Sequence, residues 1–324
     1  MNITLSANFP KLPDEIEVPL NESITGRVMN GVPTKEPLPY QLRIENKNDY
    51  SPHHCGATLI SPSYAITAHH CLSTNFGDDI PDEDFIVYAG AYELLDKNAQ
   101  KRGVRRSIPI NMKNGTRWGE LPDIALLWFD EPFDINEFVT PACLPTKEAP
   151  MNEECIVSGW GGDGTFYPPS VLHAATIVTT KLDYCKERSD PRHPIGDYDM
   201  CAYHPTRDAC GGDSGGPLVC KTNGGATLYG VVSRGQTCHV MSTEEKFGVY
   251  ANVFYFIDQI KEVIGHDNPC LINDEWYGDK ICDGNLNNSE NCFDGGDCCG
   301  EDANYKFCHI SCSSDEECFC KCRT

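Results

Sequence analysis

Short apolar runs separated by turn-forming residues dominate the stretch from residue 28 to residue 266. Examples are Ala57–Ile60, Phe85–Tyr88 and Gly230–Ser233, and the residues between such runs are rich in Gly, Pro, Asn and Asp. Frequent short strands with turn signals are typical of an all-β barrel or sandwich. We therefore predict an all-β domain over this stretch.

A different spacing appears at the end of that stretch, between Val253 and Ile264. The apolar positions there are Phe256, Ile257, Ile260, Val263 and Ile264. Intervals of three and four residues place such side chains on one face of a helix. The pattern predicts one C-terminal helix packed on the β domain.

Composition divides the rest of the chain. Residues 1–27 are polar and contain no cysteine, so we interpret them as a leader without a core. Residues 267–324 hold ten cysteines, thirteen acidic and four basic residues and few aliphatic ones. A segment with so little to bury needs covalent or metal links. We predict a leader at 1–27, a β domain at 28–266 and a small cysteine-rich module at 267–324.

Charge and cysteine content narrow the class of protein. The net charge of −22 argues against nucleic acid as a partner, because phosphate binding needs a basic surface. Nineteen cysteines indicate a disulfide framework in an oxidising compartment. Four glycosylation sequons, which begin at Asn2, Asn21, Asn114 and Asn287, agree with a secreted glycoprotein. No stretch is apolar enough to span a membrane.

The candidate chemistry begins at Ser214, in the run Cys210–Pro217. A serine flanked by glycines fits a tight turn that a substrate carbonyl can approach closely, and successive backbone N–H groups there can line an oxyanion hole. A serine hydroxyl is a poor nucleophile and needs a base. The segments around His70 and Asp123 offer an imidazole and a carboxylate that could orient it.

The order His, Asp, Ser and these local sequences resemble the chymotrypsin-like peptidase family over residues 28–266. The resemblance implies two six-stranded antiparallel β-barrels with a C-terminal helix. It implies Ser214 as nucleophile, His70 as general base and acid, and Asp123 as the carboxylate that orients His70. Gly212 and Ser214 would supply the oxyanion N–H groups. No cofactor is needed for such catalysis.

The same resemblance implies a primary specificity pocket. Asp208 occupies the position of the pocket floor, as in trypsin, and Ser233, Gly235 and Gly248 occupy positions that border the pocket. A buried carboxylate is costly unless a cation pairs with it, so we expect protein or peptide substrates with Arg or Lys before the scissile bond. Arg234 stands where the family usually has tryptophan, and we hypothesise a preference for acidic residues at neighbouring subsites.

The activation junction is expected between Arg27 and Val28. By resemblance, cleavage there creates an α-ammonium on Val28 that turns inward and pairs with Asp213. The pair then orders the oxyanion hole and the pocket. Met29 and Asn30 depart from the family's usual Val-Gly at this junction.

The resemblance also implies disulfides. The expected bridges are Cys55–Cys71, Cys155–Cys220, Cys185–Cys201 and Cys210–Cys238. Cys143 is then left over. It either bonds to the cysteine-rich tail, remains a free thiol or pairs with another chain.

Within the tail, the run from Cys292 to Cys298 resembles the core of a Lin-12/Notch repeat over about residues 270–299. Such repeats hold one Ca²⁺, and oxygen ligands suit that ion. Asp279, Asp294 and Asp297 match ligand positions, and Asp283 is a weaker candidate. A disulfide knot without metal is the alternative.

Three functions follow from these patterns. The first is a secreted serine endopeptidase made as a zymogen. The second is a catalytically silent homologue that acts as a calcium-dependent binding or scaffold protein. The third makes the tail an interaction module for an extracellular partner, and it can coexist with the first.

Overall fold

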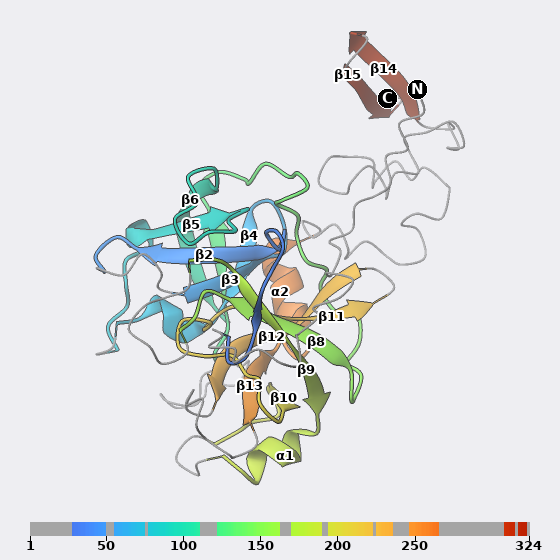
Figure 1. Ribbon diagram of the computed structural model, residues 1–324. Coiled ribbons are helices and arrows are strands. Elements are labelled where there is room, and N and C mark those ends of the chain that lie inside the picture. Colours follow the sequence, from blue (N-terminus) through green and yellow to red (C-terminus); the bar gives the residue numbers. More distant parts are fainter. Residues whose placement is uncertain are drawn as a thin grey trace.

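The structure is a computed structural model. It describes residues 28–49, 55–74, 77–110, 122–162, 170–189, 194–222, 225–235 and 246–265, and the backbone of 308–314 and 317–322. Between residues 28 and 265 the chain forms two β-barrels, with the strands of the first coloured from blue to green and the six main strands of the second from yellow-green to orange (Figure 1).

The first barrel is closed, with the strand order β2-β3-β4-β7-β6-β5 and antiparallel neighbours throughout. Its strands are β2 (Gln41–Asn46), β3 (Cys55–Leu59), β4 (Tyr64–Thr67), β5 (Phe85–Ala89), β6 (Gln100–Pro109) and β7 (Ala125–Phe129). Two short 3-10 helices belong to it, η1 (His69–Leu72) and η2 (Asp82–Asp84). Its core combines aliphatic side chains such as Leu42, Ile44 and Leu59 with aromatic ones such as Phe85 and Phe129, and all of these are buried.

The second barrel also has six antiparallel strands, because β8 pairs with both β9 and β11 and so closes the sheet. Its strands are β8 (Glu154–Gly159), β9 (His173–Thr180), β10 (Asp199–His204), β11 (Pro217–Thr222), β12 (Gly225–Gly235) and β13 (Lys246–Asn252). The two-residue strand β1 (Val32–Pro33) pairs with β9. The helix α1 (Leu182–Lys186) precedes β10. The prediction of two six-stranded barrels is confirmed.

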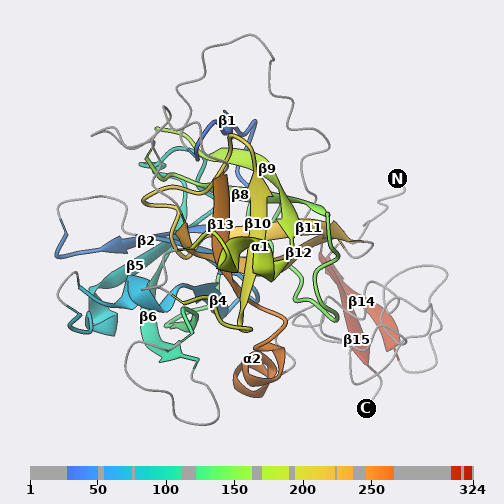
Figure 2. The same ribbon diagram turned by 90° about the horizontal axis from the view of Figure 1, so that it is seen from below.

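The C-terminal helix is shorter than the sequence pattern predicted. The helix α2 spans Ile257–Ile264, whereas the apolar spacing placed its start near Val253. The side-chain oxygen of Asn252 accepts hydrogen bonds from the N–H groups of Phe254 and Tyr255, which forms a turn before the helix. Ile257, Ile260 and Ile264 join the buried cluster that contains the core of the first barrel, and Figure 2 shows α2 at the edge of the two barrels.

Three of the four expected disulfides are present, namely Cys55–Cys71, Cys155–Cys220 and Cys185–Cys201. Cys210 is also disulfide-bonded, but Cys238 lies outside the described residues, so their pairing stays a prediction. Cys143 is disulfide-bonded as well, which excludes the free-thiol alternative. Its partner lies outside the described residues.

The tail contributes one described element, a hairpin of β14 (Cys308–Ser314) and β15 (Glu317–Cys322). The leader 1–27 and the expected calcium ligands Asp279, Asp294 and Asp297 lie outside the described residues, so the calcium site stays a prediction. In the part of the chain that the structure describes, no helix combines the length and apolar character needed to cross a bilayer.

Candidate active site

His70 and Asp123 are brought together by the pairing of two strands of the first barrel. Thr67, at the end of β4, is paired with Ala125, at the start of β7. The residues just beyond these strand ends are therefore neighbours. The Nδ1 atom of His70 lies 2.7 Å from Oδ2 of Asp123, and the backbone N–H of His70 donates to Oδ1 over 2.9 Å. The two contacts fix both the ring and the backbone of His70 against the carboxylate.

The electrostatics of this pair favour charge on both partners. Burial lowers the pKa of His70, but the hydrogen bond and charge of Asp123 outweigh it, and the net pKa is raised. Burial raises the pKa of Asp123, but hydrogen bonds from His70 and Ser233 outweigh it, and the net pKa is lowered. A base of this kind can take up a proton near neutral pH while its carboxylate stays ionised.

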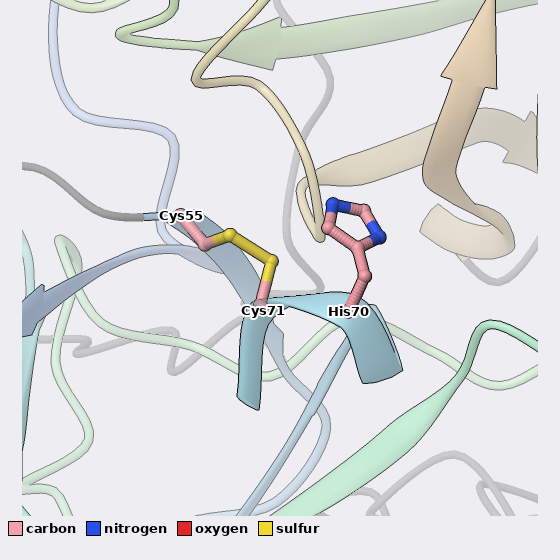
Figure 3. A group of neighbouring side chains, drawn as sticks. All are labelled: Cys55, His70 and Cys71. Carbon is pink, nitrogen blue, oxygen red and sulfur yellow. A yellow bond between two sulfur atoms is a disulfide. The ribbon is translucent and has the colours of Figure 1, made fainter. Parts of the chain in front are cut away.

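The imidazole also lies beside two sulfur atoms, which raises the question of a metal site. Cys55, His70 and Cys71 have potential ligand atoms within 4.8 Å of one another. Figure 3 shows the two cysteines joined by a disulfide, with His70 on the same short helix as Cys71. Zinc takes cysteine as thiolate, and a disulfide sulfur is not one. The bridge instead ties η1, which carries His70, to strand β3.

Ser214 lies on a loop that contacts both barrels. Gly56, on β3, donates its N–H to the Ser214 carbonyl over 2.8 Å, and the next N–H, that of Gly215, donates to Val232 of β12 over 2.8 Å. Gly215 has φ 76°, and a side chain there would collide with Thr67 at the end of β4. Only glycine suits this position. Ser214 is thereby held beside the strand that leads into His70.

The residues before Ser214 form a compact turn. Gly212 has φ 96°, a conformation that glycine adopts without strain. The N–H of Asp213 donates to the Cys210 carbonyl, and the N–H of Gly216 donates to the Asp213 carbonyl, each over 2.9 Å. These two turns order the backbone that would present the N–H groups of Gly212 and Ser214 to a substrate.

The Asp213 side chain points away from that turn into the protein. It is fully buried, and its carboxylate accepts hydrogen bonds of 2.8 Å from the N–H groups of Gly161 and Cys210. Side chains at Gly159 or Gly161 would collide with it. Burial raises the pKa of Asp213 to about 6, although both hydrogen bonds act to lower it. Among the described residues, no Lys, Arg or His forms an ion pair with Asp213.

The segment that follows Arg27 is also buried. Val28 is inaccessible to solvent and packs in a cluster of the second barrel with Val157 and Leu218. Asn30 has φ 53°, and its amide nitrogen donates to the Thr206 carbonyl over 2.6 Å. Asparagine tolerates this left-handed conformation better than other residues except glycine. The departure from the family's glycine at Asn30 is thereby explained. Arg27 lies outside the described residues.

The expected pocket residues converge on one carboxylate. Asp208 is 3% exposed, and its Oδ1 accepts the N–H of Ala209 over 2.8 Å. Gly235 and Gly248 face each other across β12 and β13. A Cβ atom at Gly248 would lie 2.8 Å from Oδ1 of Asp208, and one at Gly235 would lie 3.3 Å from Oδ2. A side chain at either glycine would therefore occupy the space in front of Asp208.

Tyr250 adds a hydroxyl to this region. A Cβ atom at Gly248 would lie 2.7 Å from that oxygen. Burial, followed by the charges of Asp208 and Asp213, raises the pKa of Tyr250 far above its ordinary value. The hydroxyl therefore stays protonated, and it has no hydrogen-bond partner among the described residues.

Ser233 contacts Asp123 through its side chain, and its expected place at the border of the pocket stays a prediction. Its hydroxyl donates to Oδ2 of Asp123 over 2.7 Å, and Nη1 of Arg234 lies 3.2 Å from the same hydroxyl oxygen. Arg234 in turn pairs with the buried carboxylate of Asp199. The sequence analysis did not single out Asp199; its only signal is an acidic residue at the start of a strand, two residues before Cys201.

Comparison with known proteins agrees with this geometry. The family model described as Trypsin matches residues 28–260. Among the similar proteins is coagulation factor IX of Oryctolagus cuniculus. It is 30% identical over 230 residues, which cover 68% of this chain and 78% of that protein. The family match covers well over half of the chain. The chain belongs to the trypsin family of serine endopeptidases.

Proposed function

We propose that the chain is a secreted, trypsin-like serine endopeptidase, made as a zymogen, that hydrolyses peptide bonds after Arg or Lys. The observation that carries the specificity is the convergence of Gly235 and Gly248 on the carboxylate of Asp208. The glycines leave room for a long side chain, and the carboxylate offers a charge that favours a cationic end. An apolar side chain would bring no cation to that buried carboxylate, which disfavours it strongly.

In the proposed mechanism, Nε2 of His70 takes the proton from Ser214 Oγ as that oxygen attacks the substrate carbonyl carbon. The carbonyl oxygen becomes negative and is stabilised by the N–H groups of Gly212 and Ser214. His70 then gives its proton to the leaving amine, and the C–N bond breaks to leave an acyl-Ser214 ester. A water molecule, deprotonated by His70, hydrolyses the ester and restores the serine.

Asp123 supports both transfers without taking the proton. Its contact with Nδ1 holds the tautomer in which Nε2 is free to accept, and its charge stabilises the imidazolium. The raised pKa of His70 fits this role, because the base becomes stronger where the proton is needed.

Activation is proposed to use the buried carboxylate of Asp213. Cleavage after Arg27 would turn the N–H of Val28 into an ammonium. Val28 already lies in the core of the second barrel, and Asp213 is buried with backbone donors only among the described contacts. An ammonium next to Asp213 would stabilise its ionised form and the turn that carries Gly212.

Secretion is supported by the three disulfides and by the likeness to a coagulation factor. Disulfides persist in oxidising compartments and are rare in the cytosol. Cys143 adds to this, because it too is disulfide-bonded.

The proposal is tested with the chain cleaved after Arg27 and short chromogenic peptides that end in Arg, Lys, Phe or Ala. We expect fast turnover of the Arg and Lys peptides only. Asp208→Ser should reduce the preference for Arg over Phe by about 10⁴-fold, because the charge that selects the cation is gone.

Two controls separate mechanism from specificity. Ser214→Ala should abolish turnover of every peptide while leaving the fold intact. Asp197→Asn changes an exposed aspartate that pairs with Lys186, and it should leave the preference unchanged. Equal turnover of Phe and Arg peptides by the unmodified enzyme would refute the specificity, and no turnover after confirmed cleavage would refute the enzyme.

A further inference from the structure

The guanidinium of Arg234 is bound by a buried carboxylate that the proposed mechanism does not use. Nη2 of Arg234 lies 2.6 Å from Oδ2 of Asp199, and Nη1 lies 3.4 Å from Oδ1. The Asp199 side chain is fully buried, and that of Arg234 is 31% exposed. Two nitrogens facing two oxygens form the strongest kind of side-chain ion pair.

Both partners are further fixed by backbone groups. The N–H of Gly196 donates to Oδ2 of Asp199 over 3.0 Å, and Nη2 of Arg234 donates to the Pro194 carbonyl over 3.2 Å. Asp199 is also the first residue of β10, where it is paired with Ala251 of β13. The carboxylate therefore belongs to the rigid part of the second barrel, and Arg234 is anchored to it.

An irregularity in β12 brings Arg234 next to Ser233. The register of β12 against β13 shifts between Val232 and Arg234, which places a bulge at Ser233. In a regular strand, successive side chains point to opposite faces, whereas a bulge redirects them. Here the two neighbours meet, with Nη1 of Arg234 3.2 Å from Oγ of Ser233.

This contact determines which way the Ser233 hydroxyl points. A serine hydroxyl has one proton to donate and lone pairs to accept, whereas a guanidinium only donates. With Arg234 as donor on one side, the Ser233 proton is directed to Oδ2 of Asp123, 2.7 Å away. Oδ2 then accepts from both Ser233 and His70, while Oδ1 accepts the backbone N–H of His70.

The pair also balances charge close to the proposed catalytic groups. Burial raises the pKa of Asp199 and outweighs the hydrogen bond and charge of Arg234, which lower it; the charge of Asp123 raises it again, and the net pKa lies above its ordinary value. Asp199 and Asp123 are therefore close enough to repel each other. Arg234 lies between them in this chain of contacts and compensates the charge of Asp199.

We propose that Arg234 and Asp199 are a positioning pair for Asp123, which they orient through the Ser233 hydroxyl, and that they thereby set the orientation and basicity of His70. The inference rests on the proposed function, because it assigns His70 and Asp123 their catalytic roles. It also revises the hypothesis that Arg234 attracts acidic substrate residues, since its charge is neutralised by Asp199.

The test reads the pKa of the His70 ring directly, by NMR titration of the full chain carrying Ser214→Ala. Among the described residues, Asp123 is the charged group that acts directly on the ring, and Ser233 links it to the pair Arg234 and Asp199. Asp199→Asn leaves an uncompensated positive charge and should lower the pKa of His70, by on the order of half a unit. Arg234→Gln leaves an uncompensated negative charge and should raise it by a similar amount.

The double variant Asp199→Asn/Arg234→Gln removes both charges and should return the pKa of His70 close to its original value. It also keeps the test decisive if Arg234→Gln alone fails to fold. Arg102→Gln is the matched control, because it breaks an arginine–aspartate pair with Asp134 on the first barrel and should leave the pKa unchanged. The same pKa in all folded variants would overturn the proposal.

Kinetics of the cleaved enzyme supply a second readout. Each single variant should lower kcat on an Arg peptide roughly 10- to 100-fold with little change in KM, because orientation of the base is disturbed rather than substrate binding. The acid limb of the kcat profile should move with the NMR values. An inactive unmodified enzyme would refute the proposed function alone, since the titration of His70 does not depend on turnover.

Discussion

Asp199 and Asp213 are two buried carboxylates of the second barrel that are stabilised in different ways. Asp199 has a resident cation, because Arg234 binds it through two nitrogens. Asp213 has two backbone donors, Gly161 and Cys210, and no side-chain cation among the described residues. Burying a carboxylate costs several kcal/mol unless a cation compensates it.

The difference shows which part of the site is already formed in the intact chain and which part is proposed to change on activation. The Asp199 pair is complete in the intact chain, so the geometry behind Asp123 does not wait for activation. Asp213 lacks a compensating ammonium until the bond after Arg27 is cut, according to the proposed function. Asp213 can therefore respond to cleavage, because its cation would form only then. Asp199 cannot respond in this way, because it already pairs with Arg234.

The largest expected effect comes from Asp213→Asn in the cleaved protein. The Val28 ammonium would be left buried without its carboxylate, which typically costs about 3–5 kcal/mol and corresponds to about a 10²- to 10⁴-fold loss of kcat/KM. Steady-state hydrolysis of an Arg peptide measures it, with Asp197→Asn as a surface control. Activity equal to that of the unmodified enzyme would show that Asp213 has no part in the switch.

The next effect concerns stability and pH. Burial raises the pKa of Asp213 from 3.8 to about 6, so the folded, uncleaved chain binds more protons than the unfolded chain between these values. Its free energy of unfolding should therefore fall as pH rises from about 4 to about 6, by at most about 3 kcal/mol. After cleavage, the ammonium should remove most of this fall.

Urea unfolding of the Ser214→Ala protein at several pH values, before and after cleavage, measures that difference. The serine variant prevents self-digestion during the experiment. Parallel stability curves for the two forms would mean that the new ammonium does not reach Asp213.

A smaller effect is expected from Ser233→Ala, which breaks the link between Arg234 and Asp123. The lost hydrogen bond is made to a charged group and is worth about 1.5 kcal/mol, so kcat should fall about tenfold. Ser233→Thr keeps the hydroxyl and should retain more of the rate. Equal rates for Ser233→Ala and the unmodified enzyme would remove Ser233 from the account of the site.

The smallest effect concerns Asn30 in the buried segment after the cleavage site. Because Asn30 has φ 53°, Asn30→Ala should destabilise the protein by about 1 kcal/mol more than Asn30→Gly. Both variants lose the hydrogen bond to Thr206, so the difference between their stabilities measures the cost of placing a residue with a Cβ atom in the left-handed conformation. Thermal unfolding of the two variants measures it. The same melting temperature for both would show that the left-handed conformation is not maintained.

Ser214 and Asp208 could be assigned from the sequence because each lies in a local motif that resembles the peptidase family, and their catalytic and pocket roles stay predictions. The structure shows that Gly215 has a left-handed backbone and that Gly235 and Gly248 lie next to Asp208. Strand pairing could not be read locally, and it is this pairing that places Asp123 against His70. The role of Ser233 and the partner of Arg234 depend on a bulge in β12 and on a buried acid on another strand, and neither leaves a local signature.

The most direct test of the account follows cleavage and activity in one sample. The intact chain is treated with an activating protease that cuts after basic residues and is then inhibited, and Arg-peptide hydrolysis is measured beside N-terminal sequencing. The account predicts that turnover rises in proportion to the fraction of chains that begin at Val28, with Asp213→Asn cleaved equally but far less active. Full activity in chains that remain uncut after Arg27, or equal activity of cleaved Asp213→Asn, would contradict it.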